Sequence, residues 1–254
     1  MSKRKSQYKF EVIHNYDHAS EHQPIELNKK TFSVHDLKSI KAKTEPQVQF
    51  FDAYYQRQVP IICQIGSAGT GKTAIALYAA LSEVLDNSTY YDKIVIIRSA
   101  VQARDIGFLK GTEEEKNEAY EAPYVALCDE LLKYKTNNYT NLKEKNLIEF
   151  ENTSFLRGQT FNNTIVIADE IQSMSYHELS TICTRLGYNS RLILCGDMKQ
   201  NDLHKKGDVS GLPRFLRVLE RMSCVSAQQI EYRPEHIVRS GIVKEFLIAE
   251  DLIS

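Results

Sequence analysis

The stretch GSAGTGKT, residues 66–73, lies between the apolar run IICQI (61–65) and the helix-like sequence AIALYAALSEVL (74–85). A strand, a glycine-rich turn and a helix in this order form the context in which GxxxxGK[ST] binds phosphate. Glycines lack a Cβ, so the backbone can turn its N–H groups inward, and the helix N-terminus adds positive potential. The alternative is an ordinary glycine turn capping a helix, and the flanking strand and helix argue against it.

The positions of this loop have distinct predicted roles. Lys72 is expected to reach the β- and γ-phosphates of a nucleotide, and the Thr73 hydroxyl to bind Mg²⁺. Gln47, upstream of the loop, is a candidate for reading the edge of an adenine. The predicted nucleotide-binding residues are Gln47, Gly66, Ser67, Ala68, Gly69, Thr70, Gly71, Lys72 and Thr73.

A second apolar run, NTIVIADEIQ (163–172), ends in two acidic residues and resembles a Walker B motif. An acidic residue at the carboxyl end of a buried strand faces the ligand crevice of an open α/β sheet. Asp169 is therefore expected to hold Mg²⁺ through its coordinated water, and Glu170 to polarise the attacking water as general base. A solvated acidic turn is the alternative, which the upstream phosphate loop disfavours.

A third apolar strand, Leu192–Cys195, continues into GDMKQNDL (196–203). Gln200 in this segment carries a neutral amide that can donate one hydrogen bond and accept another. It is a candidate for sensing the γ-phosphate or the attacking water. A polar turn after a strand is the alternative.

The composition sets bounds on the class of protein. The chain has 254 residues, 42% hydrophobic and 26% charged, values typical of a globular protein and sufficient for one large α/β domain. No run approaches the roughly 20 apolar residues that span a bilayer, and the basic start MSKRKSQYKFEV lacks the apolar part of a secretory signal. Five scattered cysteines without CxxC spacing are typical of reduced core residues. We expect a cytoplasmic location without membrane association.

The formal net charge of −1 gives no global basic field that would indicate nucleic-acid binding. Two local clusters stand out, Lys3-Arg4-Lys5 and the group Lys205, Lys206, Arg214, Arg217 and Arg221. Each is either a solvated helix face or a contact for a phosphate backbone.

The order of elements predicts one domain. Residues 1–43 are polar and are expected to form a flexible or edge segment, and 44–254 the domain itself. Apolar strands alternate with helices, which predicts an α/β fold with a mostly parallel sheet and helices on both faces. About 50 residues follow the GDMKQ segment, too few for a second core of the kind that translocating helicases use. The sequence thus predicts a single RecA-like P-loop NTPase core.

Further elements are expected from local patterns. Ser175 and Glu178 form a capping box at the start of a helix over 175–187, which Gly187 is expected to end in a left-handed conformation. The other expected elements are a helix within 44–60, a strand over 93–101, a loop over 102–122, a helix over 123–134, a short strand in 146–161, a strand over 224–232 and a helix over 234–251.

With further segments added, the chain resembles the PhoH family of P-loop ATPases over about residues 40–250. The additional segments are TEPQ (44–47), IRSAV (97–101), IGFLKG (106–111), FLRGQTFNNTIVIADEIQ (155–172), TRLGYNSRLILCGDMKQNDL (184–203), SGL (210–212) and IVRSGIVKEF (237–246). Their order and spacing are far more specific than a phosphate loop alone.

The resemblance implies ATP binding, kinship with the first core of superfamily 1 helicases, and a cytosolic setting in a bacterial cell or a phage-infected host. The chain departs from the family pattern at four positions. Ser99 stands where the family usually has Pro, Gln159 where it usually has Arg, and Ala168 and Ile171 flank the acidic pair in place of Leu and Ala. The phosphate and Mg²⁺ positions are intact, and Arg157 remains as the cation of its loop.

Phosphoryl transfer usually needs a cation at the transition state, often an arginine from a second body. Because no second core follows, we expect a neighbouring subunit to supply it, in a homo-oligomer, a hexameric ring, with nucleotide at the subunit interfaces. Arg239 and Arg185 are the leading candidates, ahead of Arg157 and Arg98. Arg185 is equally well explained as a structural ion-pair partner.

The expected function is Mg²⁺-dependent ATP hydrolysis, acting on or with RNA or single-stranded nucleic acid. One alternative is an RNA or DNA helicase or translocase, and another is a nucleotide-gated oligomeric binding module with slow hydrolysis. A P-loop kinase is disfavoured, because a kinase must exclude the water that Glu170 would activate. The catalytic candidates are Lys72, Glu170, Gln200, Arg239 and Arg185, and the metal candidates are Thr73 and Asp169.

Overall fold

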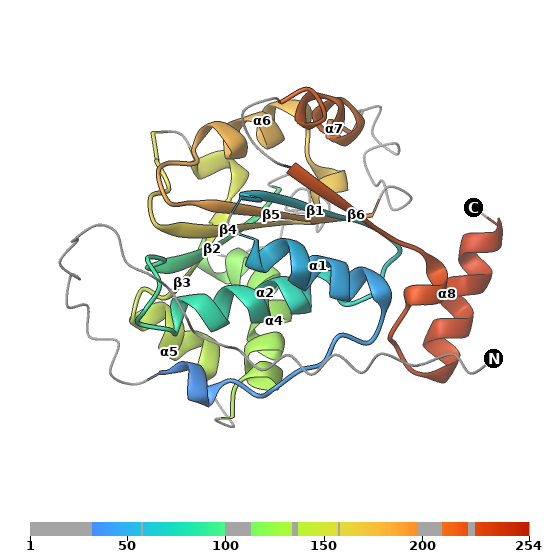
Figure 1. Cartoon of the computed structure of the whole chain (residues 1–254), viewed down its shortest axis with the longest axis horizontal. Helices are drawn as coiled ribbons and strands as arrows, with labels where there is room; N and C mark the ends of the chain where they lie inside the picture. The colour runs from blue at the N-terminus through green and yellow to red at the C-terminus, as the bar shows by residue number, and fades with distance from the viewer. Residues whose placement is uncertain are drawn as a thin grey trace.

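A six-stranded sheet forms the centre of the protein (Figure 1). The computed structural model describes residues 32–56, 58–99, 113–133, 137–156, 158–197, 210–222 and 227–253. The strands run in the order β3-β2-β4-β5-β1-β6, and every neighbouring pair is parallel. Their bounds are β1 Ile61–Gly66, β2 Lys93–Arg98, β3 Ile148–Asn152, β4 Thr164–Asp169, β5 Arg191–Gly196 and β6 Ala227–Tyr232.

Helices cover both faces of this sheet (Figure 1). One face carries α1 (Glu45–Tyr55), α2 (Lys72–Val84), α4 (Glu113–Leu131) and α5 (Asn138–Glu144), and the other carries α6 (Tyr176–Thr184) and α7 (Leu212–Leu219). The helix α8 (Gly241–Ile253) lies beside the sheet, beyond the end of β6.

The alternation of side chains explains why the strands are apolar throughout. In β4, Ile165 and Ile167 belong to the core beneath α2, whereas Val166 and Ala168 belong to the core beneath α6. A parallel strand covered on both faces buries every residue, so its sequence is a continuous apolar run. The predicted α/β class is confirmed, and the described sheet is wholly parallel. Without the edge strand β3, the order 2-4-5-1-6 is that of a RecA-like core.

The described part of the N-terminal segment, residues 32–43, packs on the core beneath α2. Phe32 and Leu37 are buried within it, and Leu37 forms an isolated antiparallel bridge with Leu132. Between them lies a single helical turn, η1 (Val34–Asp36). Residues 1–31 lie outside the described part of the chain, as does the basic cluster at its start.

The predicted loop over 102–122 is wrong from Glu113 onward, because α4 begins there and continues through Pro123. A proline was expected at the first turn of a helix, where its missing N–H costs nothing. Instead, the glutamates, lysine and alanine that precede it favour a helix strongly enough to extend it upstream, at the cost of one internal hydrogen bond. The short helix α5 was not anticipated.

The expectations for two helix ends are also wrong. The helix α6 ends at Thr184, and Gly187 does not adopt a left-handed conformation. A Cβ at this position would lie 2.9 Å from the Phe161 carbonyl oxygen and 1.9 Å from Asn162 Oδ1, so close packing favours a glycine here. The helix expected over 234–251 is split into the turn η5 (Pro234–His236) and α8. It is interrupted because the Val238 N–H, between the two, donates to the Gly69 carbonyl oxygen and not to a carbonyl of the same helix.

Candidate functional site

The three motifs meet at the carboxyl edge of the sheet. The strands β4, β5 and β1 are consecutive neighbours, with Asp169 paired to Cys195 and Ile65 paired to Gly196. The loop between β1 and α2 therefore lies beside the acidic pair after β4 and beside Asp197 after β5. This edge is where ligands bind in open α/β sheets.

The phosphate loop is shaped by its contact with the end of β6. The Ser67 N–H donates to the Tyr232 carbonyl oxygen at 2.9 Å. A Cβ on Gly66 would lie 1.8 Å from that same oxygen, and Gly66 has a φ of 133°. Only glycine fits such a backbone contact, which explains the first residue of the motif. Further along, the Val238 N–H donates to the Gly69 carbonyl oxygen at 3.0 Å.

The Lys72 ammonium is held inside the loop. Its Nζ donates to the carbonyl oxygens of Gly66 at 2.6 Å and Ser67 at 2.8 Å. Burial lowers the pKa of Lys72, while the negative charges of Asp197 and Glu170 act in the opposite direction. The predicted phosphate-binding lysine is thus a buried cation that faces the acidic residues of the neighbouring strands.

The predicted metal residues are in direct contact. The Thr73 hydroxyl donates to Asp169 Oδ1 at 2.9 Å. A hydroxyl and a carboxylate at this separation supply the hard oxygen ligands that Mg²⁺ prefers, so the pair fits the ion. The other oxygen, Asp169 Oδ2, accepts from the buried Tyr124 hydroxyl on α4 at 2.8 Å. Tyr124 was missed, because no local pattern marks a tyrosine 45 residues before its partner.

The general-base candidate Glu170 has a left-handed backbone, with a φ of 54°. Burial raises the pKa of Glu170, and the adjacent Asp169 charge raises it further. Gln172 Nε2 donates to Glu170 Oε2 at 2.5 Å, which opposes that rise. A raised carboxyl pKa is the property expected of a group that takes up a proton near neutral pH.

Gln47 supports the loop from beneath. Its Nε2 donates to the Thr70 carbonyl oxygen at 2.8 Å, and its Oε1 accepts from the Lys43 N–H at 2.7 Å. Both polar atoms are thus used within the chain, and the side chain is 3% exposed. Reading an adenine edge would require these bonds to be exchanged, so that role stays a prediction.

The arginine candidates are widely separated. Arg239 is exposed and directly follows Val238, which bonds to the phosphate loop. The Cγ atom of Arg239 lies against Gly69 of the same chain, 3.0 Å from the position that a Gly69 Cβ would occupy. Arg98 ends β2 at the carboxyl edge. The Arg185 carbonyl oxygen accepts from the Phe161 N–H ahead of β4, which places Arg185 at the opposite edge of the sheet. Arg157 and Gln200 lie outside the described residues.

The structure describes the surroundings of two positions at which the chain departs from the family pattern, Ser99 and Ala168. The Ser99 hydroxyl donates to Glu178 Oε1 at 2.9 Å, and this glutamate also closes the predicted capping box with Ser175. The serine therefore ties the end of β2 to the start of α6. Ala168 is fully buried within β4.

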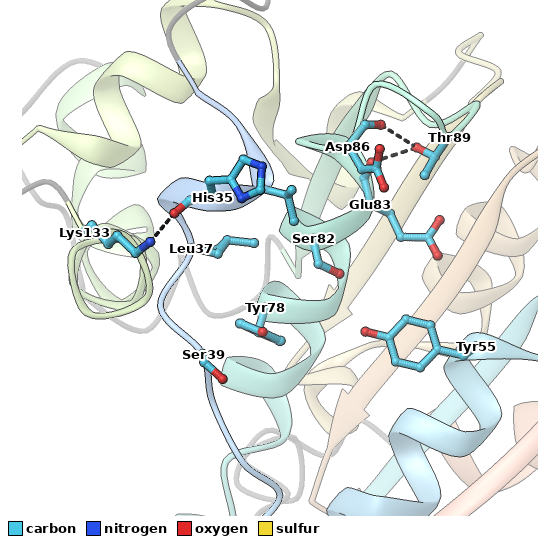
Figure 2. A pocket seen from close by; sticks show the side chains of 11 residues that line it. His35, Leu37, Ser39, Tyr55, Tyr78, Ser82, Glu83, Asp86, Thr89 and Lys133 are labelled. Carbon is cyan, nitrogen blue, oxygen red and sulfur yellow. Dashed lines mark hydrogen bonds between the residues drawn. The ribbon is translucent and has the colours of Figure 1, made fainter. Parts of the chain in front are cut away.

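A cavity of about 300 Å³ opens near the far end of α2, away from the phosphate loop (Figure 2). Its floor includes Tyr78 and Ser82, and Thr89 Oγ1 donates to the Glu83 carbonyl oxygen at 2.7 Å beside it. The lining residues are Val34, His35, Leu37, Ser39, Tyr55, Tyr78, Ser82, Glu83, Asp86, Thr89 and Lys133. None of the predicted site residues lines it.

The sheet order, the glycine loop with its buried lysine, and the threonine–aspartate pair define a P-loop nucleotide-binding protein. The family profile described as "PhoH-like protein" matches residues 39–250. The chain belongs to this family.

Curated relatives agree with this assignment. A PhoH-like protein of Bacillus subtilis is 35% identical over 84% of this chain and 65% of its own length, and one of Synechocystis is 35% identical over 83% and 62%. Protein PhoH of Escherichia coli is 32% identical over 84% and 59%. The chain thus spans about three fifths of the length of these relatives.

Among solved structures, Pif1 helicase from Candida albicans matches 76% of this chain and 41% of its own, with a TM-score of 0.37 and 14% identity. Across the described residues of the present protein, no helix combines the length and apolarity required to cross a membrane.

Proposed function

We propose that this protein is a Mg²⁺-dependent ATPase that converts ATP and water to ADP and phosphate. The observation that carries the proposal is the 2.9 Å hydrogen bond between Thr73 and Asp169. In the sequence, the buried Lys72 directly precedes Thr73, and Glu170 directly follows Asp169. The phosphate loop, a pair of metal-ligating oxygens and a general base are the parts that ATP hydrolysis requires.

Each side chain has a role in this proposal. Lys72 exchanges its bonds to the loop carbonyl oxygens for bonds to the β- and γ-phosphates. Thr73 and Asp169 would hold Mg²⁺, and the bound ion would neutralise charge on the phosphates. Glu170 accepts a proton from the attacking water and orients that water in line with the bond that breaks.

RNA or single-stranded nucleic acid is the proposed partner. Support comes from α7 and the turn that follows it, because Arg214 and Arg217 on the helix and Arg221 just beyond its end are all exposed, at spacings of three and four. The Arg214 guanidinium lies 3.9 Å from the centre of the Tyr176 ring. Positive charge beside an aromatic ring is a combination that binds single strands by backbone contact and stacking. Lys205 and Lys206 lie outside the described residues.

The proposed assembly is a homo-oligomer, a hexameric ring, in which a neighbour supplies the arginine. Arg185 supports this idea, since it lies across the sheet from its own site and would act only on another copy. Arg239, beside its own Gly69, is the alternative within one chain. The two arginine models differ in how specific activity depends on protein concentration. If a neighbouring subunit supplies the arginine, specific activity falls when the protein is diluted below the concentration at which it assembles. Specific activity that stays constant down to monomeric concentrations would exclude a shared site.

The test of the function is steady-state ATP hydrolysis with and without single-stranded RNA, with Lys72→Ala as the blank. Hydrolysis above the blank that rises several-fold with RNA supports a nucleic-acid-dependent ATPase, and unwinding assays would follow. Hydrolysis that RNA does not change supports an ATPase with another client. No hydrolysis above the blank contradicts the proposal and favours a nucleotide-gated switch.

A further inference from the structure

Gln172 joins the ends of two neighbouring strands through its side chain. It lies in the turn η3 (Ile171–Ser173), two residues after Glu170, and is 2% exposed. Its Nε2 donates to Glu170 Oε2 at 2.5 Å, and its Oε1 accepts from the backbone N–H of Asp197 at 2.9 Å. The amide therefore links the acidic pair after β4 to the first residue after β5.

The local packing leaves this amide little freedom. A Cβ on Gly196, at the end of β5, would lie 3.0 Å from Gln172 Oε1 and 2.5 Å from Ile171 Cγ1. The close approach of η3 to β5 thus depends on a glycine, and the amide spans the contact. Glu170 itself has a left-handed backbone, which is unfavourable for a non-glycine residue and persists where surrounding contacts hold it.

We propose that Gln172 is a positioning residue for hydrolysis: it fixes the Glu170 carboxylate as proton acceptor and ties its position to the end of β5. This inference rests on the proposed ATPase function and adds a residue to its machinery. A general base must be correctly placed to take the proton of its water. The Gln172 N–H bonds to the Glu170 carboxylate and holds it in place, while the Asp197 N–H bonds to Gln172 from the other side.

The test compares Gln172→Met and Gln172→Glu with Gln49→Glu, which adds the same charge on the exposed face of α1. Gln172→Met cannot donate to Glu170, and an ionised Gln172→Glu accepts from Asp197 but donates nothing. Both should lower kcat by about tenfold or more while KM for ATP changes less than twofold. Gln49→Glu should match the parent protein.

A merely structural role predicts a different result. An unchanged kcat would overturn the proposal, and so would a parallel loss of kcat, ATP affinity and unfolding midpoint. If the parent protein does not exceed the Lys72→Ala blank, the proposed function fails, and the tie to β5 is then decided by amide hydrogen exchange measured by NMR. Gln172→Met removes the acceptor of the Asp197 N–H, so this amide proton should exchange clearly faster than in the parent protein. An unchanged exchange rate would reject the role of Gln172, whether or not ATP is hydrolysed.

Discussion

Asp169 accepts hydrogen bonds on both carboxylate oxygens, from Thr73 on one side and Tyr124 on the other. The threonine bond occupies the position where Mg²⁺ would enter. The tyrosine bond comes from a different helix and leaves the metal side open. Tyr124 therefore fixes the direction of the carboxylate without competing for the ion.

Replacing Tyr124 with Phe should separate these two effects. The ring stays in place, but Asp169 Oδ2 loses its donor, so the free energy of unfolding should fall by about 1–3 kcal/mol. The Mg²⁺ concentration for half-maximal hydrolysis should rise by about tenfold, as for other residues that orient metal ligands. Urea unfolding and a Mg²⁺ titration measure both quantities. Tyr120→Phe is the matched control, because the Tyr120 hydroxyl, one turn earlier, has no hydrogen-bond partner among the described residues; equal effects would contradict this account.

Glu170 should reduce stability at neutral pH while serving catalysis. Because burial and the Asp169 charge raise its folded pKa above the unfolded value, the folded state binds more protons between the two. The stability it contributes is therefore present below the unfolded pKa, about 4.3, and is lost as pH rises through the folded pKa.

Glu170→Gln should abolish hydrolysis and raise the free energy of unfolding at pH 7. The gain should shrink as pH falls towards 4, where the parent glutamate is itself protonated. Urea unfolding across this pH range measures the difference, with the exposed Glu118→Gln as control. A gain that did not depend on pH would rule out titration of Glu170 as its source.

At the scale of elements, the loop after β1 is built against β6. The Gly66 contact with the Tyr232 carbonyl oxygen leaves no space for a side chain. A second hydrogen bond joins the end of β6 to β1, since the buried Tyr232 hydroxyl donates to Gln64 Oε1 at 2.8 Å. The shape of the loop thus depends on a strand more than 160 residues away.

Gly66→Ala should lower the free energy of unfolding by about 3 kcal/mol or more, because both the positive φ and the collision act against the Cβ. Gly158→Ala measures the effect of a positive φ alone. Gly158 has a φ of 83° with nothing within 4 Å of its Cβ position, and about 1 kcal/mol is expected there. Urea midpoints of the two variants should therefore differ clearly. Equal midpoints would show that β6 moves to accommodate the methyl group.

The parts of the site that the sequence predicts are those whose signal is local. The loop 66–73, the Asp169–Glu170 pair and the Ser175 capping box each combine residue type and spacing within a few positions, and the structure places all three as expected. Tyr124 and the backbone contact of Gly66 with Tyr232 depend on segments brought together by the fold, so no local pattern indicates them. Pro123 predicts a helix start at its own position, whereas the helix-forming residues before it extend α4 upstream to Glu113.

At the scale of the whole molecule, the site joins segments from Gln47 to Val238 around one loop. A ligand bound there contacts elements that are distant in the sequence. It should therefore stabilise the entire fold by an amount that grows with the logarithm of ligand concentration over Kd, because only the folded chain binds it.

ATP with Mg²⁺ at about 100 times its Kd should add about 2.7 kcal/mol to the free energy of unfolding. Thermal unfolding with and without nucleotide measures this as a rise in Tm, which Lys72→Ala should remove. Lys93→Ala is a matched control, since Lys93 begins β2 at the opposite edge of the sheet and pairs with Glu149 at 2.7 Å. A shift that persists in Lys72→Ala would place the nucleotide elsewhere.

The strand order also governs when the site can exist during synthesis. The first strand of the described sheet, β1, pairs with β5 and β6, so both of its edges stay open until β5 has left the ribosome, and one of them until β6 follows. Until then the growing chain carries an apolar strand with unpaired backbone, which is the kind of edge that recruits other chains. A nucleotide cannot protect this intermediate, because the wall formed by Tyr232 is still missing. The protein is therefore expected to depend on chaperones before release and on its ligand only afterwards.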